Sequence, residues 1–123
     1  MADAEEVIVE PTERASDVVP NLRLRDGESV EAVMPPEVWW VEVPVMDKAG
    51  QPRTNERDGT PRVEYVVHGL RLVRGNRPFD LTGGSGMLRE IERTKMLFSL
   101  PKAIRLRRTG SGEDTRYLAV VIA

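Results

Sequence analysis

Arginine side chains recur in pairs on three segments of this sequence that alternate apolar and polar residues. Side chains two positions apart in a strand point to the same face of a sheet. Arg23 and Arg25, and Arg105 and Arg107, are two positions apart, and the third pair, Arg71 and Arg74, is three positions apart. Guanidinium groups bind phosphate oxygens through forked N–H donors. If the three strands adjoin, these pairs merge into a basic stripe suited to a polyanion, whereas on separate strands they only solvate a face.

Binding a single nucleic-acid strand also needs exposed aromatic rings on which bases can stack. Trp39 and Trp40 are adjacent in EVWWVEVPV, so strand alternation sends them to opposite faces. Trp39 shares its face with three valines, so we expect Trp39 in the core and Trp40 exposed, unless a helix covers it. The further expected nucleic-acid contacts are Tyr65 and, in the final hairpin, Arg116.

No pattern in the sequence indicates catalysis. His68 is the only histidine and no cysteine is present, which excludes disulfides, thiolate metal sites and cysteine nucleophiles. The glycine-rich stretch TGGSG at 82–86 precedes a predicted helix and could cradle a phosphate. It lacks the Lys-Ser/Thr ending of a P-loop, so a flexible helix entry is the favoured interpretation. We expect a non-enzymatic protein with no metal and no cofactor.

The elements that must carry these residues are mostly strands. Alternating segments begin at Asn21 and are separated by a turn at Asp26-Gly27, by Pro35-Pro36 and by an exposed polar loop at 47–61. Gly69 is a candidate bulge in the strand that follows this loop. A final hairpin at 104–120 turns through GSGED, with Ile104 and Leu106 facing the core and Tyr117 packed.

One helix is predicted just before that hairpin. Its apolar stripe recurs at helical spacing, and the chain breaks at Ser99-Leu100-Pro101. The stripe consists of Met87, Ile91, Thr94 and Phe98, widened by Leu88. We expect Thr82 or Ser85 to cap the helix. The predicted fold is mainly β: a small OB-like β-barrel of about five to six strands with one helix before the final hairpin.

Charge divides the chain into an acidic arm at 1–20 and a single domain at 21–123. Residues 1–17 carry a net charge of −5 and the remaining residues carry +3. The arm either solubilises the domain, or competes with an anionic ligand or binds a partner protein. Neither a secretory signal nor an apolar run long enough to span a membrane is recognisable, so we expect a cytoplasmic protein.

Two stretches resemble phage-type single-stranded-DNA-binding proteins. The first resembles the family's opening strand through Leu24, Asp26, Gly27, Glu28 and Val30. The second is similar to its Arg-x-Gly-x-Gly-x-x-Thr-x-Tyr hairpin through Arg108, Gly110, Gly112, Thr115 and Tyr117. The segment RPFDLTGGSGML lies where such proteins place a strand entering a helix. The resemblance implies an OB-like barrel that coats single-stranded DNA during phage replication or recombination. The zinc insertion of many relatives is not implied, because this chain has no cysteine.

The sequence therefore predicts a non-catalytic protein that binds single-stranded DNA through strand arginines and an exposed aromatic, in a phage or mobile element and in the host cytoplasm. The alternative is a phage protein-interaction or virion-assembly module with the same barrel and no nucleic-acid affinity. In that case YLAVVIA would be an edge strand that pairs with a neighbouring chain in a homo-oligomer.

Overall fold

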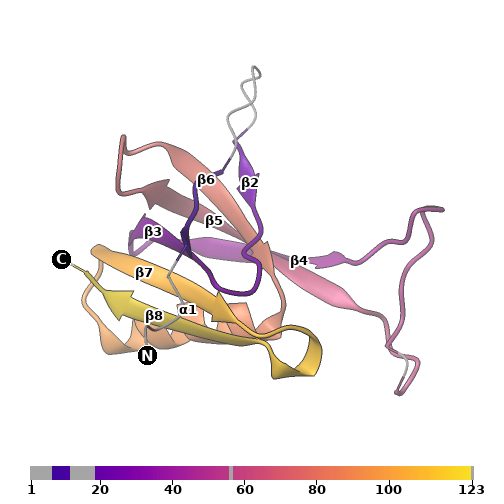
Figure 1. The fold of residues 1–123 in the computed structure, drawn as a ribbon. Helices are drawn as coiled ribbons and strands as arrows, with labels where there is room; N and C mark the ends of the chain where they lie inside the picture. The colour runs from indigo at the N-terminus through magenta and orange to yellow at the C-terminus, as the bar shows by residue number, and fades with distance from the viewer. Residues whose placement is uncertain (1–6, 12–18, 56, 123) are drawn as a thin grey trace.

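The computed structural model describes residues 7–11, 19–55 and 57–122, which contain eight strands and one α-helix (Figure 1). The elements are β1 (Val7–Ile8), β2 (Asn21–Leu22), β3 (Glu28–Met34), β4 (Trp39–Pro44), β5 (Val63–Leu72), β6 (Pro78–Gly83), α1 (Ser85–Leu97), β7 (Lys102–Thr109) and β8 (Arg116–Val121). The predicted mainly β class, with a helix before a final hairpin, is confirmed. Positions 1–6 and 12–18 of the predicted arm lie outside the described residues.

All eight strands belong to one mixed sheet, with the order β2-β6-β5-β3-β7-β8 along its main path. The two-residue strands β1 and β2 add to the five or six predicted, and each pairs in parallel, with β3 and β6 respectively. On the remaining pairs the strands are antiparallel, including β4 beside β5.

The sheet does not close into a barrel, because its two ends are not paired with each other within the described residues. The chain segment that follows β2 lies beside this unpaired part of the sheet and buries Leu24 in the core. The Arg108 guanidinium donates a hydrogen bond to the Leu24 carbonyl (2.7 Å), and the Gly27 amide donates to the Arg108 carbonyl (2.8 Å). Helix α1 packs against β8, β5 and β6. A chain segment and a helix thus fill the place of the missing strand pair.

A bulge in β5 decides which side chains reach the core. The β5–β6 register shifts between Val67 and Leu70, and Gly69 has φ +96°, as expected for the predicted bulge. Val67 and Leu70 are both buried, although they are three positions apart. His68 therefore points to the other face of the sheet.

The pairing of β4 with β5 explains why the prediction for Trp39 is wrong. Trp39 pairs with His68 across β4 and β5, so it lies on the face away from the core and is 55% exposed. Val38, next to it, is buried instead. Trp40 is exposed as predicted, but on the side that α1 covers in part.

Helix α1 confirms the predicted apolar stripe, whose buried members are Met87, Ile91 and Thr94. The predicted cap is wrong: the N-cap is Gly84, and no side chain caps the helix. Ser85 is already helical, and the Thr82 hydroxyl donates to the Asn21 side chain (2.7 Å). No helix among the described residues has the length and apolar character to cross a bilayer.

Helix α1 also covers the outer edge of β8 through one buried carboxylate. Glu90 accepts a hydrogen bond from the Ala119 amide of β8 (2.7 Å) and another from the Arg93 guanidinium (2.7 Å). Burial alone would raise the pKa of Glu90, but these two donors outweigh it and hold the pKa below its ordinary value. The ionised side chain therefore ties the helix to the sheet.

Candidate nucleic-acid interface

A groove of about 960 Å³ lies between the β4–β5 hairpin, the junction of β6 with α1, and the loop between β7 and β8. The hairpin extends well away from the body of the molecule (Figure 1). We call this the arginine groove, because its charged lining residues are Arg23, Arg53, Arg62, Arg89, Arg108, Glu64 and Glu113. Five guanidinium groups against two carboxylates leave the lining with a net charge of +3.

Backbone hydrogen bonds at the base of the hairpin position two of these arginines. The Val45 amide donates to the Arg62 carbonyl (3.0 Å), the Arg53 amide to the Val45 carbonyl (2.8 Å), and the Arg62 amide to the Arg53 carbonyl (2.9 Å). Arg53 and Arg62 are thus held on neighbouring, hydrogen-bonded segments beyond the ends of β4 and β5. The segment predicted as an exposed loop at 47–61 is exposed at all its described residues and contains this hydrogen-bonded base.

The junction of β6 with α1 forms another wall, through residues 82–86 and Arg89. Gly84 caps the helix without a side-chain hydrogen bond, and the first turn contains no acidic residue. The first amides of a helix lack intrahelical acceptors and carry the positive end of the helix dipole. This wall therefore adds to the positive potential that the arginines create.

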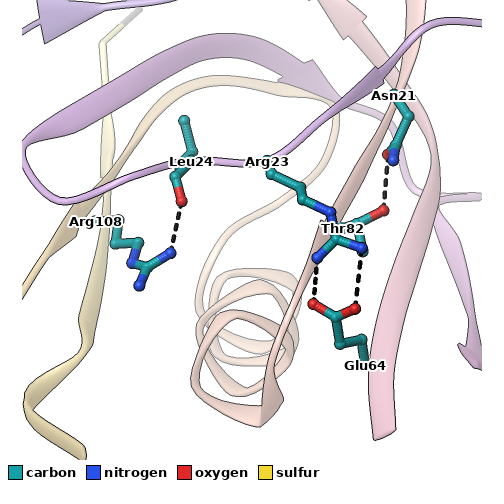
Figure 2. A network of polar contacts seen from close by, with 6 residues as sticks. All are labelled: Asn21, Arg23, Leu24, Glu64, Thr82 and Arg108. Atoms are coloured by element: carbon teal, nitrogen blue, oxygen red, sulfur yellow. Dashed lines mark hydrogen bonds and ion pairs between the residues drawn. The ribbon is translucent and has the colours of Figure 1, made fainter. Parts of the chain in front are cut away.

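Two groove arginines already have partners in the fold (Figure 2). Arg23 makes a two-pronged contact with Glu64, in which Nη2 donates to Oε1 at 2.9 Å. These hydrogen bonds and the charge of Glu64 raise the pKa of Arg23 further above its ordinary value. Arg108 binds the Leu24 carbonyl, and its Nε is buried without a hydrogen-bond partner among the described residues. Both side chains build the floor of the groove.

The other three groove arginines are Arg53, Arg62 and Arg89, and none of them has an ion-pair partner among the residues that the structure describes. They come from three separate segments: the outgoing side of the hairpin, its returning side, and α1. Their guanidinium groups are the ones available to bind an anion in the groove.

An exposed ion pair joins the two loops that flank the groove. Arg57, near the tip of the hairpin, contacts Glu113 of the β7–β8 loop at 2.5 Å, with 81% and 75% of the two side chains exposed. A second cavity of about 840 Å³ continues along the hairpin and shares Arg53, Arg62 and Glu113 with the arginine groove. Its lining contains three arginines and three carboxylates, with Asp47 and Asp58 beside Glu113, so the excess of positive charge is confined to the arginine groove.

Of the nine residues predicted to contact nucleic acid, Arg23 alone lines the arginine groove. Arg105 forms an ion pair with Glu31 of the neighbouring strand β3 (2.7 Å). Arg107 lies two positions further along β7, half-buried. Because β3 separates β7 from β5 and contributes a carboxylate, these arginines do not continue into the pair on β5 as one basic stripe.

The remaining predicted arginines lie at separate places on the surface. Arg71 donates to the Asn76 side chain (2.9 Å) at the β5–β6 turn, where Arg74 is also exposed. Arg116 donates to backbone carbonyls of its own loop. Arg25 is exposed after β2. None of these four arginines lines the arginine groove, so their predicted role in binding is an alternative to binding in the groove.

The two predicted aromatic contacts pack against each other. Trp40 and Tyr65 form an edge-on pair with ring centroids 5.4 Å apart. The Trp40 indole N–H donates to Glu92 of α1 (2.9 Å), and the Tyr65 hydroxyl donates to Glu42 (3.5 Å). Two carboxylates therefore flank this pair and would repel a phosphate backbone.

Tyr117 lines the arginine groove and packs against the core, as predicted for this residue. Burial raises the pKa of its phenol, an effect that the positive charges of Arg108 and Arg23 partly oppose. The residue therefore contributes a neutral, largely covered ring to the groove floor.

Sequence reasoning missed Arg53, Arg62, Arg89 and Arg108 as members of one site. A signal was present in the polar segment PRTNERDGTPR, which carries three arginines among turn-forming residues. Their meeting with Arg89 depends on the tertiary fold. Comparison with known proteins gave no matching family model, no matching curated protein and no matching solved structure.

Proposed function

We propose that this protein binds single-stranded DNA without catalysis and holds the phosphate backbone in the arginine groove. The observation that carries the proposal is the convergence of Arg53, Arg62 and Arg89, from three segments, on one groove without carboxylate partners among the described residues. Gathering like charges destabilises a compact state. A polyanion in the groove removes that repulsion and releases its own counterions, which favours binding.

The arrangement of the elements supports the same ligand. If β3 and β4 are counted as two halves of one interrupted strand, the sheet has five main strands, with the helix before the last two. OB folds are likewise five-stranded, partly open barrels. Those folds bind oligonucleotides on the face of their second and third strands, between the loop after the first strand and the loop before the last. In this chain the arginine groove lies beside β5 and β6, between the β4–β5 hairpin and the β7–β8 loop.

The groove suits a single strand better than a duplex. Its volume is about that of a pocket for one small ligand, which accommodates a short stretch of one backbone. A duplex would have to meet the protein through a protruding element instead, and a two-stranded ribbon can enter a major groove. The β4–β5 hairpin protrudes in this way, so a duplex belongs in the test.

The experiment is fluorescence anisotropy with labelled oligo-dT at low salt, beside a duplex of equal length. We expect micromolar or tighter binding to oligo-dT and weaker binding to the duplex. The double variant Arg53→Ala/Arg62→Ala should bind oligo-dT more weakly. The matched control Arg71→Ala/Arg74→Ala removes the same charge at the far end of β5 and should bind like the wild type. Lack of binding to oligo-dT at low salt would overturn the proposal.

A protein-interaction module remains the second candidate, because apolar side chains are exposed on β8. Leu118 is 57% and Val120 43% exposed, on a strand at the end of the sheet. Such an edge can pair with another chain. The Glu90 carboxylate already occupies the Ala119 amide of this edge, which disfavours an added strand. Light scattering that gives a monomer at all concentrations would count against this candidate.

A further inference from the structure

An exposed tryptophan on the outer face of the sheet is held in place by a histidine. The Trp39 indole stacks on the His68 imidazole with ring centroids 4.3 Å apart and an interplanar angle of 29°. The two residues are register partners on β4 and β5. Even so, 55% of Trp39 is exposed, which makes its ring accessible to a ligand.

A third strand fixes the histidine beneath this ring. His68 Nδ1 and Asp80 Oδ1 of β6 are 2.8 Å apart, and only about a quarter of each side chain is exposed. The hydrogen bond restrains the imidazole, and the stacked imidazole restrains the indole. A ring that is already ordered loses less conformational entropy when a ligand stacks on it.

The face of Trp39 leads along β4 to the arginine groove. Val41 shares this face and is 37% exposed, and Val43, two positions further, lines the groove. Alternate residues of a strand are about 6.6 Å apart, so Trp39 lies about 13 Å from Val43. A ligand long enough to fill the groove and continue along β4 therefore reaches Trp39.

We infer that Trp39, backed by His68, is a stacking platform for a nucleobase of the strand whose phosphates the arginine groove holds. The inference rests on the proposed function and adds a second contact of different chemistry. Every base presents a flat π face, so such a platform accepts bases with little regard to sequence.

Trp39 suits this role better than its neighbour Trp40. The Trp40 indole N–H is bound to Glu92, and its ring meets Tyr65, whose hydroxyl is bound to Glu42. At Trp39 the nearest partner residue is a histidine, and the carboxylate behind it, Asp80, is engaged by that histidine.

Single-tryptophan variants test the inference directly, because the chain contains only two tryptophans. In Trp40→Phe all tryptophan emission comes from Trp39, and in Trp39→Phe it comes from Trp40. We expect oligo-dT to quench the emission of Trp40→Phe and to leave that of Trp39→Phe nearly unchanged. An oligomer of abasic residues with the same number of phosphates should bind without quenching.

Affinity measurements complete the test. Trp39→Ala should weaken binding of oligo-dT by about 5- to 150-fold, the range that alanine substitution at a base-stacking residue produces. It should leave binding of the abasic oligomer unchanged, and Trp39→Phe should recover most of the affinity. Equal binding of oligo-dT by wild type and Trp39→Ala would overturn the platform while leaving the proposed function intact. Equal losses for both oligomers would also overturn it, and no binding by the wild type would remove the proposed function and the platform together.

Discussion

Removal of Arg53 and Arg62 is expected to change how strongly salt weakens the binding of single-stranded DNA. Both guanidinium groups line the arginine groove and neither has an ion-pair partner within the described part of the chain. Each phosphate that such a group neutralises releases condensed counterions, so log Kobs falls linearly with log salt. The slope therefore counts phosphate contacts, independently of any effect on bases.

The structure sets the expected size of the slope. Arg53, Arg62 and Arg89 give three phosphate contacts, and each contributes about −0.7 on a single strand, so the wild-type slope is about −2. Between 50 and 200 mM salt the affinity should then fall about 20-fold. With alanine at both hairpin positions a single contact remains, and the slope should shrink to about −0.7, a loss of about 3-fold over the same range.

The assay is a salt titration of oligo-dT binding by fluorescence anisotropy, with Arg71→Ala/Arg74→Ala as the matched control. The control pair lies about nine residues along β5 from Arg62, a distance of roughly 30 Å in an extended strand. The control should keep the wild-type slope. If the control pair shrinks the slope and the groove pair does not, the basic residues at the β5–β6 turn bind the strand and the reasoning about the groove is wrong.

Three further predictions concern the fold and the rim of the groove. Glu90→Ala leaves a buried β8 amide without its acceptor and should lower the free energy of unfolding by about 1–3 kcal/mol in a urea titration. The pKa of Glu90 is depressed in the folded state, so its ionised form stabilises the protein fully at pH values above its unfolded pKa near 4.5. The difference in free energy of unfolding between wild type and Glu90→Gln should therefore narrow as pH falls below that value. Gly110→Ala places a Cβ atom 2.3 Å from the Asp114 backbone oxygen at φ +79° and should destabilise the protein by more than about 1–2 kcal/mol. Gly112→Ala also has a positive φ but lies in open space, so it should be destabilised only by the backbone strain, about 1–2 kcal/mol. Glu113→Gln removes a carboxylate from the groove rim and should raise affinity for oligo-dT about 2- to 5-fold at low salt, with an unchanged thermal midpoint, since an exposed ion pair contributes little stability; weaker binding by this variant would contradict a phosphate-binding groove.

Local signals in the sequence were sufficient for several elements. The helical spacing of Met87 and Ile91 predicts α1, and alternation around the GSGED turn predicts the final hairpin. Gly69 predicts the bulge in β5, because glycine readily adopts the positive φ that the irregularity requires. Each of these features depends on residues close together in the chain.

The features that sequence reasoning missed depend on residues far apart in the chain. The prediction for Trp39 failed because the faces of β4 are set by its pairing with β5, where Trp39 lies opposite His68 and Trp40 lies opposite the buried Val67. The predicted OB-like barrel does not close, and the segment containing Leu24 and helix α1 pack where a further strand pair would close it. The groove was missed because Arg53 and Arg89 come together only in the fold.

The pairing of charges across the molecule distinguishes two classes of arginine. Arg23, Arg93 and Arg105 each have a carboxylate partner, and each of these pairs joins elements of the fold or braces a helix. The chain has 20 acidic and 18 basic side chains, so carboxylates are not scarce. Arg53, Arg62 and Arg89 nonetheless line one groove without such partners within the described ranges. A shortage of acids therefore does not explain this arrangement. If the proposed polyanion supplies the missing negative charge, the salt titration measures how many charges it supplies.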